Sequence, residues 1–455
     1  MFAIAGALVS VVRFWQYETF YYDFGIFDQA LWRVAHFAPP IIDHFVVGGK
    51  WIFADHFNPS IFLLSPLYWI FSAPETMLVA QASAVGIGGF LLYLTGVKVL
   101  KNRLLAFAAM ISYLLFVGVQ NAVITDFHEV TIASCTFIAA YYALVSQKPR
   151  WYFLFLLLTL GFKESNFIVG TGMGVSIFFL NRKWWKIALV TCLISLVWGA
   201  LAIKVIIPFF SGGFYQYGSE QISFNPLHIV TSFIDVPVKV KTILYSFWSF
   251  GFVSLLSPAF YGLIFLDFLT RFSSPNWVLR WELGLHYSIL LSAILGVSAV
   301  FGLRLLQRFL PRVVLTIIAL AIIGNALFLY RFVMHGPFAL AYNPSFYQHT
   351  HDFVFLDVLL SKIPANASVM TQNSLAGHFT HRNMWLLRID YEPYKPDYIA
   401  IDARPGQRLD GLWGSVNIGH LPDSINELIG KIKADVNYQL VYHSGDHYLF
   451  KRVGK

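Results

Sequence analysis

The sequence predicts an α-helical, polytopic membrane protein that ends in a small soluble α/β domain. Three observations lead to this prediction: 57% of the 455 residues are hydrophobic, only 12% are charged, and the apolar residues gather in long runs with Lys and Arg at their ends. Soluble domains carry about 25% charged residues, so lipid is the natural solvent for most of this chain. The polar composition that returns after Gly336 marks the soluble part.

Apolar runs of helix length follow one another through the first three quarters of the chain, with basic clusters between them. Lys and Arg favour the cytoplasmic side, and about eleven crossings would place every basic cluster on that side. The segments outside would then be residues 15–58, 124–128, 209–238 and the tail after 334. The expected spans are roughly 1–14, 76–97, 103–123, 129–147, 151–162 paired with 165–181, 184–208, 239–256, 258–271, 284–303 and 313–333. The basic clusters are Lys98, Lys101 and Arg103; Lys148 and Arg150; Arg182, Lys183 and Lys186; and Arg304, Arg308 and Arg312.

This pattern divides the chain into a membrane domain, 1–335, and a soluble α/β domain, 336–455, on the extracytoplasmic side of the cell membrane. In the membrane domain, the external loop 15–58 is expected to carry interfacial helices. In the soluble domain, helices are expected at roughly 351–362 and 422–433, and Ser444 to Asp446 fit the turn of a terminal hairpin. The expected strands are Ala367–Thr371, Tyr398–Asp402, Tyr438–His443 and Tyr448–Arg452.

The first external loop contains two carboxylates, Asp23 and Asp28, in the stretch YYDFGIFDQALW. Apolar residues recur at helical spacing through this stretch, which predicts an amphipathic helix along the outer membrane interface. The two acids lie five positions apart, so on a helix they point about 140° apart. A carboxylate at such an interface can act as a general base on an acceptor, although capping and solvation are the simpler roles.

Four further groups of ionisable residues lie in segments assigned to the same side of the membrane. Ionisable side chains at membrane depth are unfavourable by several kcal/mol, so they are candidates for function. Each group alone has a structural explanation, such as helix capping or mutual neutralisation. The groups are Asp55 with His56; Asp126, His128 and Glu129; Lys163 and Glu164, between two short spans; and His286 with Tyr287.

Several other functions lack their sequence signatures. No basic stripe indicates nucleic-acid binding, and no Walker loop, dinucleotide fingerprint or nucleophile elbow is present. Asp126, His128 and Glu129 could supply oxygen and nitrogen ligands to a divalent cation, but their spacing matches no dedicated zinc motif. No other cofactor is indicated. A membrane enzyme without a nucleotide fold would take an activated substrate from the lipid phase.

Several stretches resemble, in order, a family of prokaryotic multi-spanning membrane proteins, DUF2079. They are YYDFGIFDQALW, DHFNPSIFLLSPLY, DFHEVTIA, KES, LHYSIL, IPANASVMTQNSLAGHFTHR and PDYIAID. That family is distantly similar to the GT-C glycosyltransferases, such as protein O-mannosyltransferases and aminoarabinose transferases. The resemblance implies a GT-C-like fold and transfer of a sugar from a polyprenyl-phosphate donor to an extracytoplasmic acceptor.

The resemblance also implies residue roles. Asp23 matches the catalytic acid of the first external loop, although Phe24 follows it where many relatives have a second acid. Asp28 or His56 would orient Asp23, and HFNPSIF from His56 is a loose counterpart of a His- or Lys-Pro-Pro-Leu pattern. In those enzymes basic residues near the outer interface hold the lipid phosphate, and the candidates here, by location alone, are Lys163, Arg280 and His286. The other substrate-binding candidates, from their positions in the sequence, are Asp126, His128, Glu129, Glu164 and Tyr287. The alternative is a non-catalytic transporter or a structural subunit of a membrane complex, with broken helices and buried charge serving transport.

Overall fold

The computed structural model describes residues 1–42, 49–213, 215, 217, 225–273, 278–404 and 425–454. The chain forms two compact units. The first comprises Met1–Val9, Phe53–Ile61 and Val79–Ala341, and the second comprises Ser10–Ile52, Phe62–Leu78 and Tyr342–Lys455. The second unit thus combines most of the first external loop with the C-terminal segment, whereas the sequence-based boundary at 335/336 stays a prediction.

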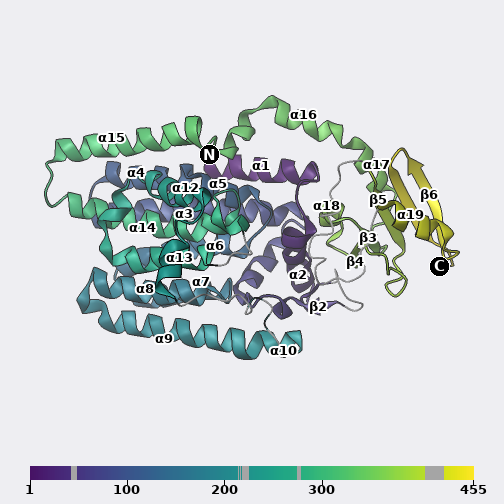
Figure 1. Cartoon of the computed structure of the whole chain (residues 1–455), viewed down its shortest axis with the longest axis horizontal. Helices are drawn as coiled ribbons and strands as arrows, with labels where there is room; N and C mark the ends of the chain where they lie inside the picture. Colours follow the sequence, from purple (N-terminus) through teal and green to yellow (C-terminus); the bar gives the residue numbers. More distant parts are fainter. Residues whose placement is uncertain are drawn as a thin grey trace. The chain divides into compact units, whose positions relative to one another are not determined.

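The first unit consists of helices packed around α14 (Figure 1). Hairpin neighbours such as α6 and α7 or α8 and α9 pack along one another, and α4 packs on both α14 and α15. Helix α1 (Phe2–Trp15) begins in this unit and continues into the second. The other helices are α3 (Glu75–Leu100), α4 (Arg103–Leu115), α5 (Val117–Ile124), α6 (Glu129–Val145), α7 (Pro149–Gly161), α8 (Asn166–Leu180), α9 (Trp185–Leu201), α10 (Ile207–Ser211), α11 (Pro226–Thr231), α12 (Pro237–Trp248), α13 (Tyr261–Phe272), α14 (Ile289–Leu306) and α15 (Arg312–Phe328).

Within the described ranges, four helical stretches are long and apolar enough to cross a membrane. They are Glu75–Leu100, Arg182–Ser211, His286–Leu306 and Arg312–Val333, and α4 with α5 makes a fifth if that bent pair is one span. Shorter apolar helices are Phe2–Trp15, Glu129–Val145 and Asn166–Leu180. The expected multi-pass architecture is therefore confirmed, whereas the count of about eleven crossings stays a prediction.

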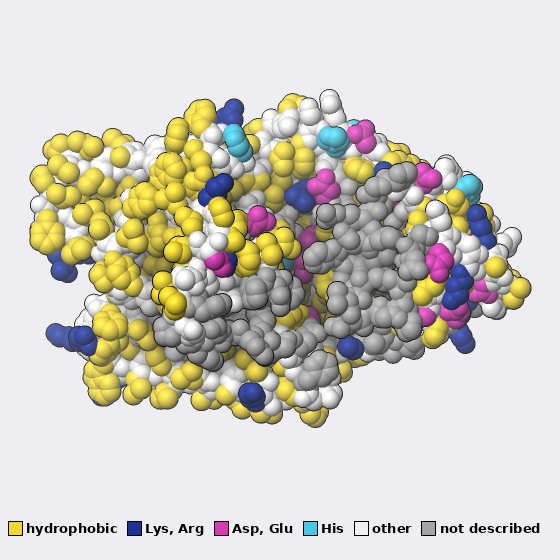
Figure 2. All heavy atoms as spheres, viewed as in Figure 1, with side chains coloured by type: hydrophobic (Ala, Val, Ile, Leu, Met, Phe, Trp, Pro, Cys, Tyr) yellow, Lys and Arg dark blue, Asp and Glu magenta, His cyan; other side chains and the backbone are white. Residues whose placement is uncertain are grey.

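Burial separates the central helix from the outer ones. In the apolar stretch of His286–Leu306, 78% is buried inside the protein, against 28% in the apolar stretches of Arg182–Ser211 and Arg312–Val333. The outer helices therefore present aliphatic side chains such as Leu193 and Ile317 outward. Hydrophobic side chains cover most of the visible surface over the helices, and Lys and Arg are sparse there (Figure 2). Such a surface is stable in lipid and not in water.

Two breaks in the helices bear on function. The sequence predicts one span over 103–123, but the backbone of Phe116 is extended, with ψ of 127°, and the two halves bend by 48° at this residue. The periodicity of apolar residues runs unbroken through this point and so could not reveal the bend. The second break lies between α7 and α8, where Lys163 and Glu164 occupy the turn, as the two short predicted spans required.

The second unit contains a five-stranded sheet of order β4-β3-β5-β7-β6. Strands β3 (Val369–Thr371), β4 (Met384–Leu386) and β5 (Tyr398–Asp402) are parallel, and β7 (His447–Arg452) pairs antiparallel with both β5 and β6 (Tyr438–Ser444). Gly445 forms the hairpin turn with φ of +56°, a conformation that glycine adopts without strain. Helix α19 (Ile425–Ala434) buries Leu428, Ile429 and Ile432 in the core of this sheet.

The expected α/β character of the C-terminal segment is confirmed. Strand β4 was not expected from the sequence. The expected helix at 351–362 corresponds to α16 (Pro344–Asp352) and α17 (Val354–Ser361), and residues 422–424 of the other lie outside the described residues. From the first external loop, this unit also contains the π-helical turn Tyr21–Gly25, α2 (Ile26–Ala35) and the paired strands β1 (Ile41–Ile42) and β2 (Lys50–Trp51).

Candidate functional site

An ion pair between His56 and Glu164 lies inside the first unit. His56 Nδ1 is 2.8 Å from Glu164 Oε1, and Glu164 is fully buried. The other carboxylate oxygen accepts the backbone N–H of Phe57 at 3.2 Å. Burial by itself lowers the pKa of His56, but the Glu164 carboxylate outweighs burial and leaves that pKa above its ordinary value. The carboxylate from the α7–α8 turn therefore favours the protonated form of His56.

Two tyrosines extend this pair. The Tyr215 hydroxyl donates to Glu164 Oε1 at 2.8 Å, and the Tyr217 hydroxyl donates to Asp55 Oδ1 at 2.9 Å. The Tyr217 ring stacks on the imidazole of His56, with centroids 4.6 Å apart. The sequence assigned residues 209–238 to the same side of the membrane as His56 but singled out neither tyrosine. These contacts fix the orientation of both charged groups.

A second buried ion pair adjoins the first along the chain. Lys163 Nζ lies 2.9 Å from Glu129 Oε1, and the Lys163 side chain is 22% exposed, against 1% for Glu129. Lys163 also acts electrostatically on His56 and Glu164. The partial exposure of Lys163 matters because it leaves room for the ammonium to bind a further anion, whereas Glu129 and Glu164 are enclosed.

The turn between α5 and α6 is held by Gln81, a residue that the sequence did not single out. Its side-chain nitrogen donates to the backbone oxygen of Asp126 at 2.8 Å, and its oxygen accepts the N–H of His128 at 2.8 Å. Asp126 needs such support because its φ of +45° lies in the left-handed region, which side-chain-bearing residues rarely adopt. Gln81 thus positions both His128 and Glu129.

His286 brings the start of α14 to this turn. Its ring stacks on that of His128, with centroids 3.4 Å apart, and lies beside Tyr287. The charges of Lys163, Arg271 and Arg280 all act on His286. Arg271 is buried and donates to the backbone oxygens of residues 280 and 282, so it fixes the segment that carries Arg280. The first unit therefore contains the following candidate residues: His56, His128, Glu129, Lys163, Glu164, Arg280, His286 and Tyr287. Their common role in one substrate site stays a prediction.

The metal hypothesis receives no support from this arrangement. In the part of the chain that the structure describes, no three His, Cys, Asp or Glu side chains come together in a way that could hold a metal ion. Asp126, His128 and Glu129 follow one another closely in sequence. However, the Glu129 carboxylate pairs with Lys163, and the His128 ring stacks on that of His286.

A buried amide lies next to the His56 segment. Asn58 is fully buried, and within the described ranges neither its side-chain oxygen nor its nitrogen has a hydrogen-bond partner. Buried polar groups are nearly always hydrogen-bonded, so this amide is suited to a water or a polar ligand. Asn58 follows His56 by two residues in the quoted stretch DHFNPS and belongs to the same polar cluster in the sequence, but it was not assigned a role.

The second unit holds the other predicted carboxylates, Asp28 and Asp23, in contrasting surroundings. Asp28 is fully buried on α2 and accepts the hydroxyl of Tyr68 at one oxygen. Its other oxygen accepts the hydroxyl of Thr380 at 2.5 Å and lies 3.1 Å from His381 Nε2. The His381 ring stacks on that of Trp32 with centroids 5.0 Å apart. Asp28 thus ties α2 to the segment after β3.

Further contacts strengthen this tie. The N–H of Tyr22 donates to Asn373 Oδ1 at 2.9 Å, Gln29 donates to the backbone oxygen of Arg382 at 3.0 Å, and Arg33 donates to Asn383 Oδ1 at 3.1 Å. The stretches YYDFGIFDQALW and TQNSLAGHFTHR, more than 300 residues apart, therefore form one structure. Sequence reasoning found both stretches but could not join them. Asp23, in the π-helical turn just before α2, is exposed.

Comparison with known proteins identifies the family. The family described as predicted membrane protein, DUF2079, matches residues 13–435, a range that includes every candidate residue above. The chain belongs to the DUF2079 family. No curated protein sequence matches this DUF2079 chain.

The fold of this DUF2079 protein also occurs in a solved structure. ArnT from Cupriavidus metallidurans bound to undecaprenyl phosphate matches with a TM-score of 0.51 at 11% identity, over 98% of this chain and 97% of ArnT. The apo state of ArnT matches over the same shares at 11% identity with a TM-score of 0.47. The similarity to the first structure shows that the DUF2079 chain has a GT-C-like membrane fold.

Proposed function

We propose that this protein is a membrane glycosyltransferase that moves a sugar from a polyprenyl-phosphate donor to an acceptor on the extracytoplasmic side. The observation that carries the proposal is the group of buried charges around Lys163 and His56 within a bundle of GT-C-like fold. Ionisable side chains are costly to bury in an apolar bundle, so their presence favours a functional role. The phosphate of an anionic lipid is a natural ligand for the cations among them. ArnT, which shares the fold, binds undecaprenyl phosphate.

The cationic part of the site suits the leaving group. Transfer breaks the bond between the anomeric carbon and a phosphate oxygen, and the electron pair stays on the lipid phosphate. The partly exposed Lys163 ammonium, the Arg280 guanidinium and the imidazole of His286 would donate to that phosphate as its negative charge develops. Glu129 and Glu164 would hold Lys163 and His56 in place without contacting the phosphate.

The acceptor needs a base, and Asp23 is the proposed one. Asp23 is exposed, so its carboxylate is accessible to an acceptor hydroxyl or amine, whose proton it would take. Asp28 is enclosed by Tyr68, Thr380 and His381, so a positioning role for α2 suits it better than contact with substrate. The exposure and the burial support these separate roles.

The test is consumption of donor by purified protein in liposomes. Undecaprenyl-phosphate sugars of several kinds are supplied with cell-envelope acceptor material, and release of undecaprenyl phosphate is followed by mass spectrometry. We expect one donor to be consumed, Asp23→Asn to slow release by about 100- to 10,000-fold, and the remote Arg150→Gln variant to behave as wild type. Undiminished release by Asp23→Asn would remove Asp23 from the mechanism. A protein that consumes no donor and binds no undecaprenyl phosphate would favour the transporter or structural-subunit alternative instead.

A further inference from the structure

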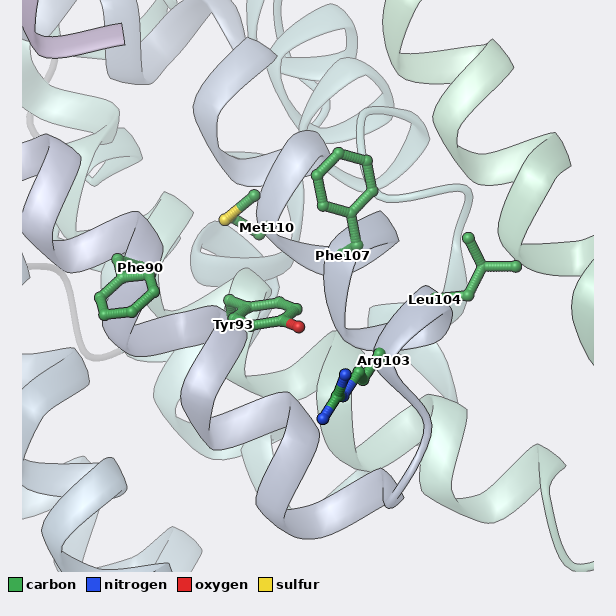
Figure 3. Close-up of a pocket in the computed structure, with 6 residues that line it drawn as sticks. All are labelled: Phe90, Tyr93, Arg103, Leu104, Phe107 and Met110. Atoms are coloured by element: carbon green, nitrogen blue, oxygen red, sulfur yellow. The ribbon is translucent and has the colours of Figure 1, made fainter. Parts of the chain in front are cut away.

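A cavity of about 490 Å³ lies between α3 and α4, and none of the candidate residues above lines it. Its walls are apolar side chains at helical spacing, so one face of each helix contributes. In Figure 3, the Tyr93 hydroxyl and the Arg103 guanidinium point toward the same opening. The lining residues are Phe90 and Tyr93 of α3 and Arg103, Leu104, Phe107 and Met110 of α4.

The cavity opens on the outer surface of the bundle. Phe90 is 56% and Phe107 40% exposed, so aromatic rings form its rim. In a multi-pass membrane protein, such a rim faces acyl chains. An apolar groove of several hundred Å³ with one cation at its end fits an amphiphile that has an anionic head.

The turn that closes the groove is strongly basic. Lys98, Lys101 and Arg103 are exposed, and none of them forms an ion pair with an acid within the described residues. The geometry of the turn is fixed, because Lys101 adopts a φ of +51° and the Asn102 side chain caps α4 by accepting the N–H groups of Leu104 and Leu105. The three cations are therefore held beside the groove.

A second basic turn belongs to the same end of the bundle. The side-chain nitrogen of Gln307, at the end of α14, donates to the backbone oxygen of Leu100 at 3.0 Å. This hydrogen bond joins the α14–α15 turn to the α3–α4 turn. The exposed cations Arg304, Arg308 and Arg312 accordingly lie at the same end as Lys98, Lys101 and Arg103.

From this juxtaposition we propose that the α3–α4 groove binds an anionic glycerophospholipid of the cytoplasmic leaflet. One acyl chain lies along Phe90, Phe107 and Met110, and the headgroup phosphate contacts Arg103 near the Tyr93 hydroxyl. The charge of the six cations selects an anionic head over a zwitterionic one, and their sign assigns this end to the cytoplasmic side. Donor binding is proposed for the opposite side, so the occupant here is a bilayer phospholipid and not the polyprenyl phosphate.

Native mass spectrometry of the detergent-purified full chain tests this proposal. The protein is exchanged with phosphatidylglycerol, phosphatidylcholine or undecaprenyl phosphate, each at the same mole fraction. We expect wild type to retain one phosphatidylglycerol, and Arg103→Gln to weaken this retention by about tenfold or more, as for loss of a charged hydrogen bond. Arg150→Gln, which removes an exposed cation elsewhere on the predicted cytoplasmic side, serves as the matched control and should retain the lipid as wild type does.

A second variant tests the groove independently of the charge. Met110 lines the groove, so Met110→Trp should fill the groove and displace the acyl chain. A side chain added at Gly89, next to Phe90, would instead meet Leu114. Thermal unfolding without added lipid checks that the variants fold. Equal retention of phosphatidylcholine, wild-type retention by Arg103→Gln and Met110→Trp, or preferential retention of undecaprenyl phosphate would each overturn the proposal.

Discussion

His56 Nδ1 lies 2.8 Å from Oε1 of Glu164, a residue 108 positions further along the chain. The pair joins the end of the first external loop to the turn between α7 and α8, and the fully buried Glu164 has no solvent to replace a lost partner. Most of what we expect of the first unit depends on this pair.

The first prediction concerns the strength of the pair. Glu164→Gln removes the carboxylate that favours the protonated form of the partly buried His56, so we expect a loss of about 3 kcal/mol in the free energy of unfolding. His56→Gln should cost a similar amount, and the double variant should lose less than the sum, by about 1–3 kcal/mol. Denaturant unfolding in detergent measures all three. Glu282→Gln, at an exposed site, is the control, and strictly additive losses would contradict the coupling.

The same pair predicts a pH dependence. The pKa of His56 in the folded protein lies above its ordinary value of 6.5, so the folded state holds the proton more tightly than the unfolded state does. The stabilisation is therefore fully present below about pH 6.5 and is lost as the pH rises through the folded-state pKa. The difference in stability between wild type and Glu164→Gln should shrink from pH 6 to pH 9. A difference that is constant over this range would show that His56 is neutral in the folded protein.

The two acids of the first external loop should separate stability from activity. Asp28→Asn replaces an acceptor of two hydroxyls by a group that must also donate, and we expect a loss of about 1–3 kcal/mol. Asp23→Asn, five residues earlier and exposed, should change stability less than Asp28→Asn does, while slowing donor consumption by about 100- to 10,000-fold. Thermal unfolding and the release assay on both variants test this contrast. The converse pattern would exchange the proposed roles of base and positioning residue.

Burial of His378 should make the stability of the second unit sensitive to acid. Its ring lies between Phe14 and Tyr17, with centroids 4.2 and 4.5 Å away, and burial lowers its pKa from 6.5 to about 4. The unfolded state therefore takes up a proton first, and stability should fall as the pH drops from about 6.5 toward 4, by on the order of 2 kcal/mol. His378→Phe keeps the stacking and should remove this part of the pH dependence. An identical acid profile for that variant would exclude His378 as the source.

The sequence predicted those parts of the fold that rest on composition and periodicity. Long apolar runs located the helices, and the return of polar residues after Gly336 located the C-terminal sheet. The bend at Phe116 was missed because apolar residues continue through it, and strand β4 was also missed.

The candidate site was predictable only in part, for a related reason. An ionisable residue in an apolar segment is visible in the sequence, so His56, Glu129, Lys163 and Glu164 could be named. Their neutral partners were not visible, because a tyrosine or glutamine in a membrane protein is common. Tyr215, Tyr68 and Gln81 gain significance only through the carboxylate or backbone group that each contacts. The pairing of Asp28 with Thr380, 352 positions away, is a property of the tertiary structure alone.

The most direct test of the central claim is an electron cryomicroscopy structure of the protein in nanodiscs with undecaprenyl phosphate in excess. We expect phosphate density within hydrogen-bonding distance of Lys163 and close to Arg280 and His286, and we expect this density to be lost in Lys163→Met. Phosphate density elsewhere, or a Lys163 ammonium that contacts only Glu129 in the presence of saturating lipid, would contradict the proposed transferase site.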